Sequence, residues 1–202
     1  MNKLTAESID LLRRMIAIPS ESFGEEAVAG LLYDPLDGWG LAPARYRNNI
    51  VCKCSPYSPG KKTLVLDAHI DTVSAASGYT RDPYDAGDDD GIIYGLGSND
   101  DGGSLVSLLD VYMRMYKRNL PYRLVYAATA EEEVCGAGCI QTIMDEVGPV
   151  ALAIVGEPTG MRLAVAERGL LVLDCKSAGV SGHAAREEGV NAIYNALPDI
   201  DW

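Results

Sequence analysis

Acidic and imidazole side chains follow directly after apolar, strand-like runs at several places in this sequence. In open α/β sheets, ligands bind in the crevice beyond the carboxyl ends of the strands. Four such groups delivered to one crevice would supply many oxygen ligands and one nitrogen, which is the ligand set of a two-metal hydrolase. The groups, each with the apolar run before it, are 63–68 with His69-Ile70-Asp71, 94–97 with Asp100, 124–130 with Glu131-Glu132-Glu133, and 150–156 with Glu157.

His69 and Asp71 lie two residues apart, so an extended chain places both side chains on one face. His69 suits a metal ligand, and Asp71 suits the carboxylate that fixes the imidazole tautomer and raises its basicity. A core histidine paired with an aspartate is the alternative, and the other three groups favour the metal. The triplet Glu131-Glu132-Glu133 could likewise be a solvated acidic turn, but its position directly after a buried strand favours a site.

The turn Gly95-Leu96-Gly97 ahead of Asp100 lets the backbone come close to a ligand. It does not match a dinucleotide fingerprint, because the third glycine is missing and an acidic group would repel a pyrophosphate. Glu157 ends a very apolar run and precedes Pro158, and a carboxylate in such a position needs a partner. Both acids therefore favour the same metal-binding crevice.

Helical and strand-like spacings alternate along the chain in a βαβ rhythm. This rhythm predicts an α/β fold with a mostly parallel central sheet flanked by helices on both faces. Pro19 closes the first helix, and Pro35 and Gly38 stop the second. The predicted helices are 4–16, 25–33, 105–118 and 137–145, and the predicted strands are 44–47, 50–54, 63–68, 123–128 and 150–155.

The character of the sequence changes near Glu167, where we place the boundary between two domains, 1–166 and 167–202. The pattern beyond it predicts one long strand over 169–178 and a short helix over 190–197. A strand and a helix of this size cannot bury a core alone. The tail therefore resembles the first part of a second, smaller domain.

Composition narrows the class of protein and its partners. The formal charge of −12 argues against a nucleic-acid partner, because no basic stripe exists to displace counterions from phosphates. The first residues lack the apolar core of a signal peptide, and no run is long enough to span a bilayer, so we expect no membrane association. Five cysteines, an odd number without framework spacing, favour a reducing cytoplasm.

The cysteines also allow two other kinds of site, which the sequence does not favour. Cys52-Lys53-Cys54 could be half of a metal site, but no second Cys or His pair lies at a suitable distance. Cys135 as a nucleophile would need a nearby histidine base, and the chain has only two histidines. Buried or idle thiols are the better interpretation.

Five short motifs resemble those of one family of metallopeptidases and deacylases, which includes acetylornithine deacetylase, succinyl-diaminopimelate desuccinylase, aminoacylase and the glutamate carboxypeptidases. Their order and approximate spacing agree over nearly the whole chain. Glu157-Pro158-Thr159, followed by Glu167-Arg168-Gly169, most resembles the acetylornithine deacetylase branch. The five motifs are His69-Ile70-Asp71-Thr72-Val73, Gly95-Leu96-Gly97-Ser98-Asn99-Asp100, Ala130-Glu131-Glu132-Glu133, Gly156-Glu157-Pro158-Thr159 and Ser181-Gly182-His183-Ala184-Ala185.

The resemblance implies a zinc-peptidase-like catalytic domain, the start of a smaller α+β lid or dimerisation domain, and a homodimer. It also implies two divalent metal ions, zinc in the first place, with cobalt and manganese as alternatives. His69 and Glu157 would hold one ion, Glu133 would hold the second, and Asp100 would bridge both.

The implied reaction is hydrolysis of a small N-acyl amino acid, as in the deacetylation of acetylornithine, or of an N-acetyl or N-succinyl ornithine or citrulline, in arginine biosynthesis. Glu132 would be the general base and acid, Asp71 would orient His69, and His183 would reach a partner subunit's active site and help hold the scissile carbonyl. Desuccinylase and metallodipeptidase activities are the alternatives within the family. A non-catalytic fragment that keeps the fold is the alternative outside it.

The chain departs from the family pattern at two points. Gly102 stands where the family commonly carries a lysine. The family's second metal takes a histidine from a late return of the chain, and these 202 residues do not supply it, with His183 as the alternative ligand. We therefore expect the 202 residues by themselves to be catalytically inactive. The resemblance also predicts a cis peptide bond between Asp100 and Asp101.

Overall fold

The computed structural model covers residues 1–202 and describes residues 3–54, 60–87, 91–166, 168–183, 185–186 and 188–202. Glu167, where we expect the second domain to begin, and Ala184 of the motif at 181–185 lie outside the described residues. The chain divides into two compact units, Met1–Arg162 and Leu163–Trp202. Across the described part of the chain, no helix has both the length and the apolar character needed to cross a membrane.

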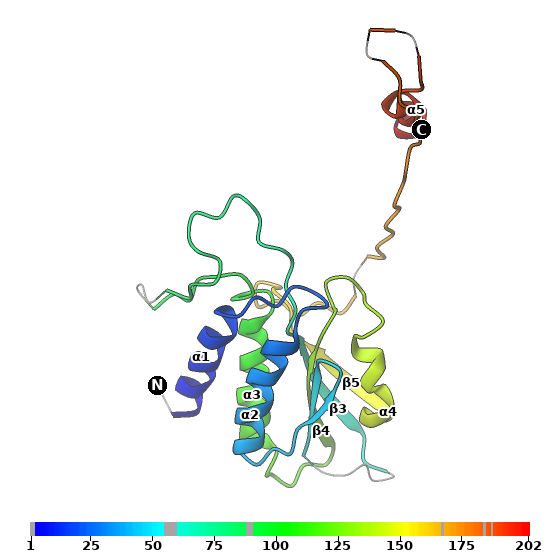
Figure 1. Cartoon of the computed structure of the whole chain (residues 1–202). Coiled ribbons are helices and arrows are strands. Elements are labelled where there is room, and N and C mark those ends of the chain that lie inside the picture. Colours follow the sequence, from blue (N-terminus) through cyan, green and yellow to red (C-terminus); the bar gives the residue numbers. More distant parts are fainter. Residues whose placement is uncertain (1–2, 55–59, 88–90, 167, 184, 187) are drawn as a thin grey trace. The chain divides into compact units, whose positions relative to one another are not determined.

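The first unit is built around one mixed sheet of five strands in the order β1-β2-β4-β3-β5 (Figure 1). β3 pairs in parallel with β4 on one side and with β5 on the other, whereas β1–β2 and β2–β4 are antiparallel pairs. The predicted α/β class is confirmed. The three parallel strands β3, β4 and β5 are the ones that precede the groups at 69–71, 131–133 and 157. The strands are β1 (Ala44–Tyr46), β2 (Asn49–Lys53), β3 (Thr63–His69), β4 (Arg123–Thr129) and β5 (Val150–Val155).

Helices cover both faces of this sheet (Figure 1). Successive strand residues point to opposite faces, so Leu66 and Tyr126 enter one core and Val65 and Val125 enter the other. The first core also receives α1, α2 and α3, and the second receives Ile143 and its neighbours in η1 and α4. The helices are α1 (Lys3–Ile16), α2 (Glu26–Gly38), α3 (Gly102–Met115), the 3-10 helix η1 (Ile140–Ile143) and α4 (Met144–Val147).

The helix α2 continues past Pro35 to Gly38, so its predicted end near residue 33 is wrong. Proline removes only its own N–H, and its carbonyl still accepts a hydrogen bond. The Trp39 N–H donates to the Pro35 carbonyl at 2.9 Å, which closes the last turn. Leu36 is fully buried in the core, and its burial favours the additional turn.

The helix predicted over 137–145 is wrong in its first part, because helical structure begins at Ile140. The residues before it instead fold around the carboxylate of Glu131, which accepts a hydrogen bond from the Gly138 N–H at 2.7 Å. A Cβ on Gly136 or Gly138 would collide with that carboxylate. The two glycines are therefore needed for a close approach, and they are poor helix formers besides.

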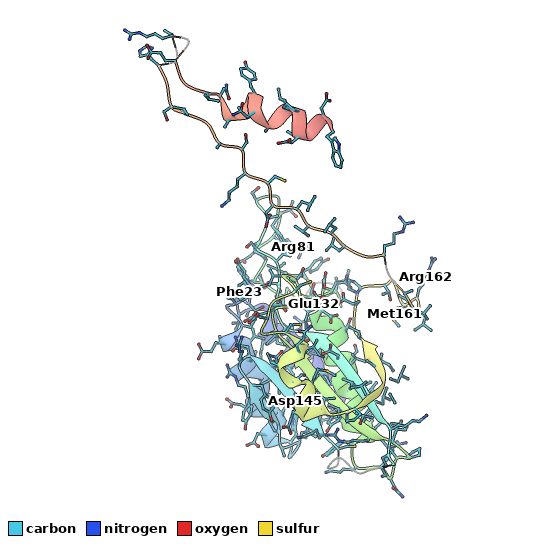
Figure 2. All side chains as sticks on the ribbon, turned by 90° about the vertical axis from the view of Figure 1, so that its right-hand side faces the viewer. Phe23, Arg81, Glu132, Asp145, Met161 and Arg162 are labelled. Atoms are coloured by element: carbon cyan, nitrogen blue, oxygen red, sulfur yellow. The ribbon has the colours of Figure 1, made fainter. Side chains whose placement is uncertain are left out.

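The second unit holds little regular structure among its described residues. It contains α5 (Ala192–Asp201) and an isolated bridge between Val180 and Val190. The predicted strand over 169–178 is wrong, because these residues find no neighbouring strand for their N–H and C=O groups. The described side chains of this unit project without a packed core (Figure 2), and the exposed apolar ones include the consecutive residues Leu170, Leu171, Val172 and Leu173.

Leu109 lies in the middle of α3 and is fully buried in the first core. We expect Leu109→Ala to lower the free energy of unfolding by about 2–5 kcal/mol, because it removes buried methyl groups and leaves a cavity. Val111→Ala on the same helix is the matched control, since Val111 is 48% exposed. Urea unfolding followed by circular dichroism measures both variants. Equal losses for the two would contradict the burial of Leu109.

Candidate metal centre

The carboxyl ends of β3, β4 and β5 meet at one edge of the sheet, because the three strands run in parallel. His69, the last residue of β3, pairs with Thr129, the last residue of β4. Asp67 pairs with Val155, the last residue of β5, and the Asp67 carbonyl accepts a hydrogen bond from the Gly156 N–H at 2.7 Å. The chain segments that follow these strands therefore start from the same edge.

Two overlapping groups of potential ligands share His69. Ligand atoms of His69, Asp100 and Glu133 all lie within 4.8 Å of one another, and so do those of His69, Glu132 and Glu157. One imidazole nitrogen with several carboxylate oxygens suits a divalent ion such as zinc. The donor set therefore fits the metals that the sequence predicts, and the structure brings together the four residues predicted to bind them.

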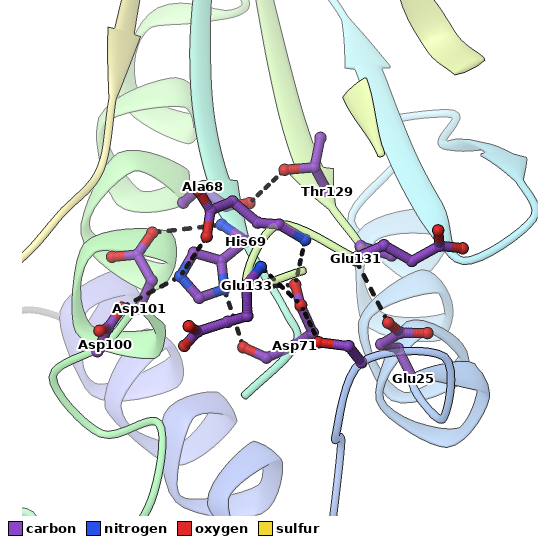
Figure 3. Close-up of polar contacts among 12 residues, drawn as sticks. Glu25, Ala68, His69, Asp71, Asp100, Asp101, Thr129, Glu131 and Glu133 are labelled. Atoms are coloured by element: carbon purple, nitrogen blue, oxygen red, sulfur yellow. Dashed lines mark hydrogen bonds and ion pairs between the residues drawn. The ribbon is translucent and has the colours of Figure 1, made fainter. Parts of the chain in front are cut away.

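The two ring nitrogens of His69 face different partners (Figure 3). Nδ1 lies 2.8 Å from the backbone oxygen of Asp71, and an oxygen can only accept, so Nδ1 carries the proton in this contact. Nε2 lies 3.1 Å from Asp100 Oδ1 and 4.0 Å from Glu132 Oε2. The imidazole is 2% exposed, so its orientation is tightly held. Nε2 is therefore the nitrogen available to a metal.

Asp71 does more than the sequence predicted for it. Its carboxylate oxygen Oδ1 lies 3.4 Å from His69 Nδ1, which is farther than the 2.8 Å between Nδ1 and the backbone oxygen of Asp71. The same carboxylate accepts hydrogen bonds from the Glu132 N–H at 3.0 Å, the Glu133 N–H at 3.1 Å and the Ser22 hydroxyl at 2.8 Å. Burial would raise the pKa of Asp71, but the His69 imidazole and these hydrogen bonds lower it below its ordinary value. Asp71 thus holds the backbone of both glutamates as well as facing the histidine.

Asp101 is a buried member of the site that sequence reasoning did not assign. Its side chain is 1% exposed, and Oδ2 accepts a hydrogen bond from the His69 N–H at 3.3 Å. The signal in the sequence was the second acid of the Asp100-Asp101 pair. The predicted cis peptide bond between these two residues is confirmed. Gly102 follows, and a Cβ there would meet the Gly97 carbonyl oxygen at 2.6 Å, so a side chain at this position would require the neighbouring backbone to shift.

A family model described as peptidase family M20/M25/M40 matches residues 65–188, which is more than half of the chain. The chain belongs to this family. The matched region runs from β3 into the second unit and includes all the residues gathered around His69. Membership confirms the resemblance drawn from the five motifs.

Relatives of the M20 family chain extend the likeness beyond that region. This chain is 30% identical over 203 residues to the uncharacterized protein YgeY of Escherichia coli (strain K12), and the match covers 96% of this chain and 49% of the relative. It is 31% identical over 209 residues to acetylornithine deacetylase of Proteus mirabilis (strain HI4320), covering 96% and 53%. The chain therefore spans about half the length of the curated relatives it matches.

Solved structures share the M20 fold at lower identity. An M20 family metallo-carboxypeptidase, Sso-CP2 from Sulfolobus solfataricus, matches with a TM-score of 0.60 and 20% identity over 77% of this chain and 37% of the other. The Bacillus subtilis YXEP protein, described as a dinuclear metal binding peptidase from the M20 family, matches with a TM-score of 0.56 and 13% identity over 75% and 42%. At these identities the likeness shows the fold alone.

Electrostatics of the M20 site raise the pKa of three of the residues proposed to bind metal. Burial by itself would lower the pKa of His69, but Asp71, Asp101 and Glu132 raise it to about 10. Burial raises the pKa of Glu133, and the nearby charge of Asp100 raises it further. Burial likewise raises the pKa of Glu157, with additional repulsion from neighbouring carboxylates. A metal must displace the proton on His69, so its affinity rises with pH.

The predicted residue His183 belongs to the second unit, whereas the residues gathered around His69 belong to the first. Its Nδ1 accepts a hydrogen bond from the Ala185 N–H at 3.2 Å, and its carbonyl accepts one from the Arg186 N–H at 2.9 Å. These contacts are local to the turn. A role for His183 in a partner subunit's active site stays a prediction.

Proposed function

We propose that this M20 family chain carries the catalytic residues of a metal-dependent amide hydrolase that removes the acyl group from an N-acyl amino acid. The observation that carries the proposal is one buried imidazole with Nδ1 committed to Asp71 and Nε2 facing oxygen ligands. Several negative carboxylates close together at one edge of the sheet repel one another and lower the stability of the fold unless cations neutralise them. The carboxylates that form potential ligand groups with His69 are Asp100, Glu132, Glu133 and Glu157.

In this proposal His69 and Glu157 would hold one divalent ion, Glu133 would hold the second, and Asp100 would serve as a ligand to both. When bound, two such ions lower the pKa of a water molecule and polarise the carbonyl oxygen of the amide. Zinc is the first candidate because a histidine with carboxylates suits it, with cobalt and manganese as alternatives. The dinuclear metal binding named for the Bacillus subtilis relative supports two ions.

Glu132 is the proposed general base and general acid. Its side chain is 46% exposed, and Oε2 lies 4.0 Å from His69 Nε2, so it borders the ligand cluster and still reaches solvent. It takes the proton of the attacking water and later donates it to the nitrogen of the leaving amine. The hydrogen bond from its own N–H to Asp71 fixes the position from which it does so.

The finer parts of the proposal concern substrate and assembly. Acetylornithine, or another N-acetyl or N-succinyl derivative of ornithine or citrulline in arginine biosynthesis, is the proposed substrate, supported by the Proteus mirabilis relative. We propose a cytoplasmic homodimer in which domain 167–202 brings His183 to the partner's site. Five free cysteines agree with a reducing compartment.

An activity panel on the purified whole protein tests this function. N-acetyl and N-succinyl amino acids and unmodified dipeptides are incubated with protein that has been stripped of metal and reloaded with zinc, cobalt or manganese. We expect release of free amino acid from an N-acyl substrate with reloaded protein and none with stripped protein. Hydrolysis of dipeptides alone would support the metallodipeptidase alternative. Metal binding without any turnover would support the non-catalytic alternative.

A further inference from the structure

Four consecutive backbone N–H groups, 130–133, donate to buried side chains that come from elsewhere in the chain. Two of them, at Glu132 and Glu133, donate to the Asp71 carboxylate. The Ala130 N–H donates to Asn49 Oδ1 at 2.9 Å, and the Glu131 N–H donates to Glu25 Oε1 at 3.3 Å. The segment follows β4 and has left the sheet ladder, so these side chains replace the strand partners it lacks.

Glu25 is a fully buried carboxylate just ahead of α2. Besides the Glu131 N–H, its Oε1 accepts a hydrogen bond from the Phe23 N–H at 2.8 Å, and its Oε2 accepts one from Asn48 Nδ2 at 2.9 Å. Each of these donors is neutral, and together they satisfy both oxygens. Figure 3 shows Glu25 facing the backbone of Glu131 on the side away from His69.

Residues 130–138, which contain the three consecutive glutamates, are called the acidic loop here. Asn49, the first residue of β2, is fully buried and contacts both ends of this loop. Its Oδ1 accepts from Ala130, where the loop begins, and its Nδ2 donates to the Gly138 carbonyl at 2.6 Å, where the loop closes. The same Nδ2 lies 3.1 Å from Thr142 Oγ1 and 3.1 Å from the Tyr46 carbonyl. An amide is required here, because one end must accept and the other must donate.

Glu131 completes the loop from within. It has a positive φ of 59°, and its carboxylate turns back to accept the Gly138 N–H. Its carbonyl accepts the Gly136 N–H at 2.8 Å. The first of the three acidic residues is therefore a brace of the loop, which leaves Glu132 and Glu133 to face the ligand cluster.

We propose that Glu25 and Asn49 are positioning residues, which fix the backbone on both sides of Glu132 and Glu133 and so set the place of the base and of one metal ligand. This inference rests on the proposed function, since it assigns a purpose to the same site. Neither residue belongs to the ligand groups, so both act through the loop. Displacing a catalytic group by about 1 Å is enough to cost on the order of 100-fold in rate, which is why such a support matters.

Variants of the whole protein test the hydrogen bonds of Glu25 and those of Asn49 separately. Glu25→Ala removes every acceptor, whereas Glu25→Gln keeps an oxygen for the Glu131 N–H. Asn49→Asp keeps the acceptor for Ala130 and loses the donor to Gly138. Glu26→Gln is the matched control, because Glu26 is the exposed neighbour of Glu25 on α2 and undergoes the same change of charge.

The measurements are the cobalt affinity and visible absorption spectrum of each variant, its kcat and KM, and its fold by circular dichroism. We expect Glu25→Ala and Asn49→Asp to lower kcat about 10–100-fold with KM nearly unchanged, to weaken cobalt binding about 10–100-fold, and to change the cobalt spectrum. We expect Glu25→Gln to keep most of the parent's kcat, cobalt affinity and cobalt spectrum, and Glu26→Gln to match the parent in all three. Should Glu25→Ala fail to fold, Asn49→Asp and the smaller shifts of Glu25→Gln carry the same comparison.

Folded variants at both positions that keep the parent's kcat, cobalt affinity and spectrum would overturn the proposal, even if their unfolding temperatures fell. A parent that binds cobalt but hydrolyses nothing would sink the proposed function alone, because the affinity and spectrum would still report on the loop. A parent that binds no cobalt would overturn both.

Discussion

We expect Glu132→Gln to abolish turnover of the whole protein and to leave its metal content nearly unchanged. Glutamine has nearly the shape of glutamate but cannot take a proton from water, and a general base contributes on the order of 10²–10⁴ in rate. The backbone of residue 132 stays in place in this variant, since the hydrogen bond to Asp71 comes from the main chain. The loss therefore falls on the chemical step.

The measurement is kcat on the best N-acyl substrate together with the metal content per chain. Glu133→Gln is the comparison, because Glu133 belongs to the other group of ligand atoms, with His69 and Asp100. That variant is expected to lose one metal. Glu132 also lies within ligand distance of His69 and Glu157, so a reversed result has a clear meaning. If Glu132→Gln lost a metal and Glu133→Gln did not, the two roles would be exchanged.

We expect that removing bound metals reverses the dependence of the free energy of unfolding on pH. In the metal-free protein the pKa of His69 is raised from 6.5 to about 10, so its stabilising contribution is present below 6.5 and is lost as pH rises towards 10. Burial raises the pKa of Asp101 from 3.8 to about 7, so its charged form costs stability increasingly as pH rises through that range. Both effects make the metal-free protein less stable with rising pH.

With metal present the sign changes, because ions compete with protons for the same groups and bind more tightly as pH rises. A site with free ion at about 1,000 times its Kd adds roughly 4 kcal/mol to the free energy of unfolding. Urea unfolding of this chain at several values between pH 6 and pH 9, with chelator or with excess zinc, measures the two slopes. Parallel slopes would contradict metal binding at His69. His69→Ala is the control, and it is expected to lose most of the difference.

Much of the fold was predictable from local patterns. Apolar runs at 63–68 and 123–128 match β3 and β4 within a residue, because buried parallel strands read as continuous apolar segments. The apolar run at 150–155 matches the edge strand β5, whose side chains are exposed in this structure. The helix α1 also follows its apolar spacing closely. The pattern failed at 169–178, where an apolar run has no neighbouring strand among the residues that the structure describes. Strand formation needs a partner, and a run of residues cannot state whether one is present.

The sequence by itself determined that His69, Glu132, Glu133 and Glu157 gather, because residues placed after parallel strands meet at one edge of the sheet. Only the tertiary structure decided how they are held. Asn49 and Glu25 contact the acidic loop from positions far away in the chain, and the Asp71 carboxylate binds the backbone of Glu132. Such hydrogen bonds depend on folded proximity rather than on spacing along the chain, so no local pattern encodes them.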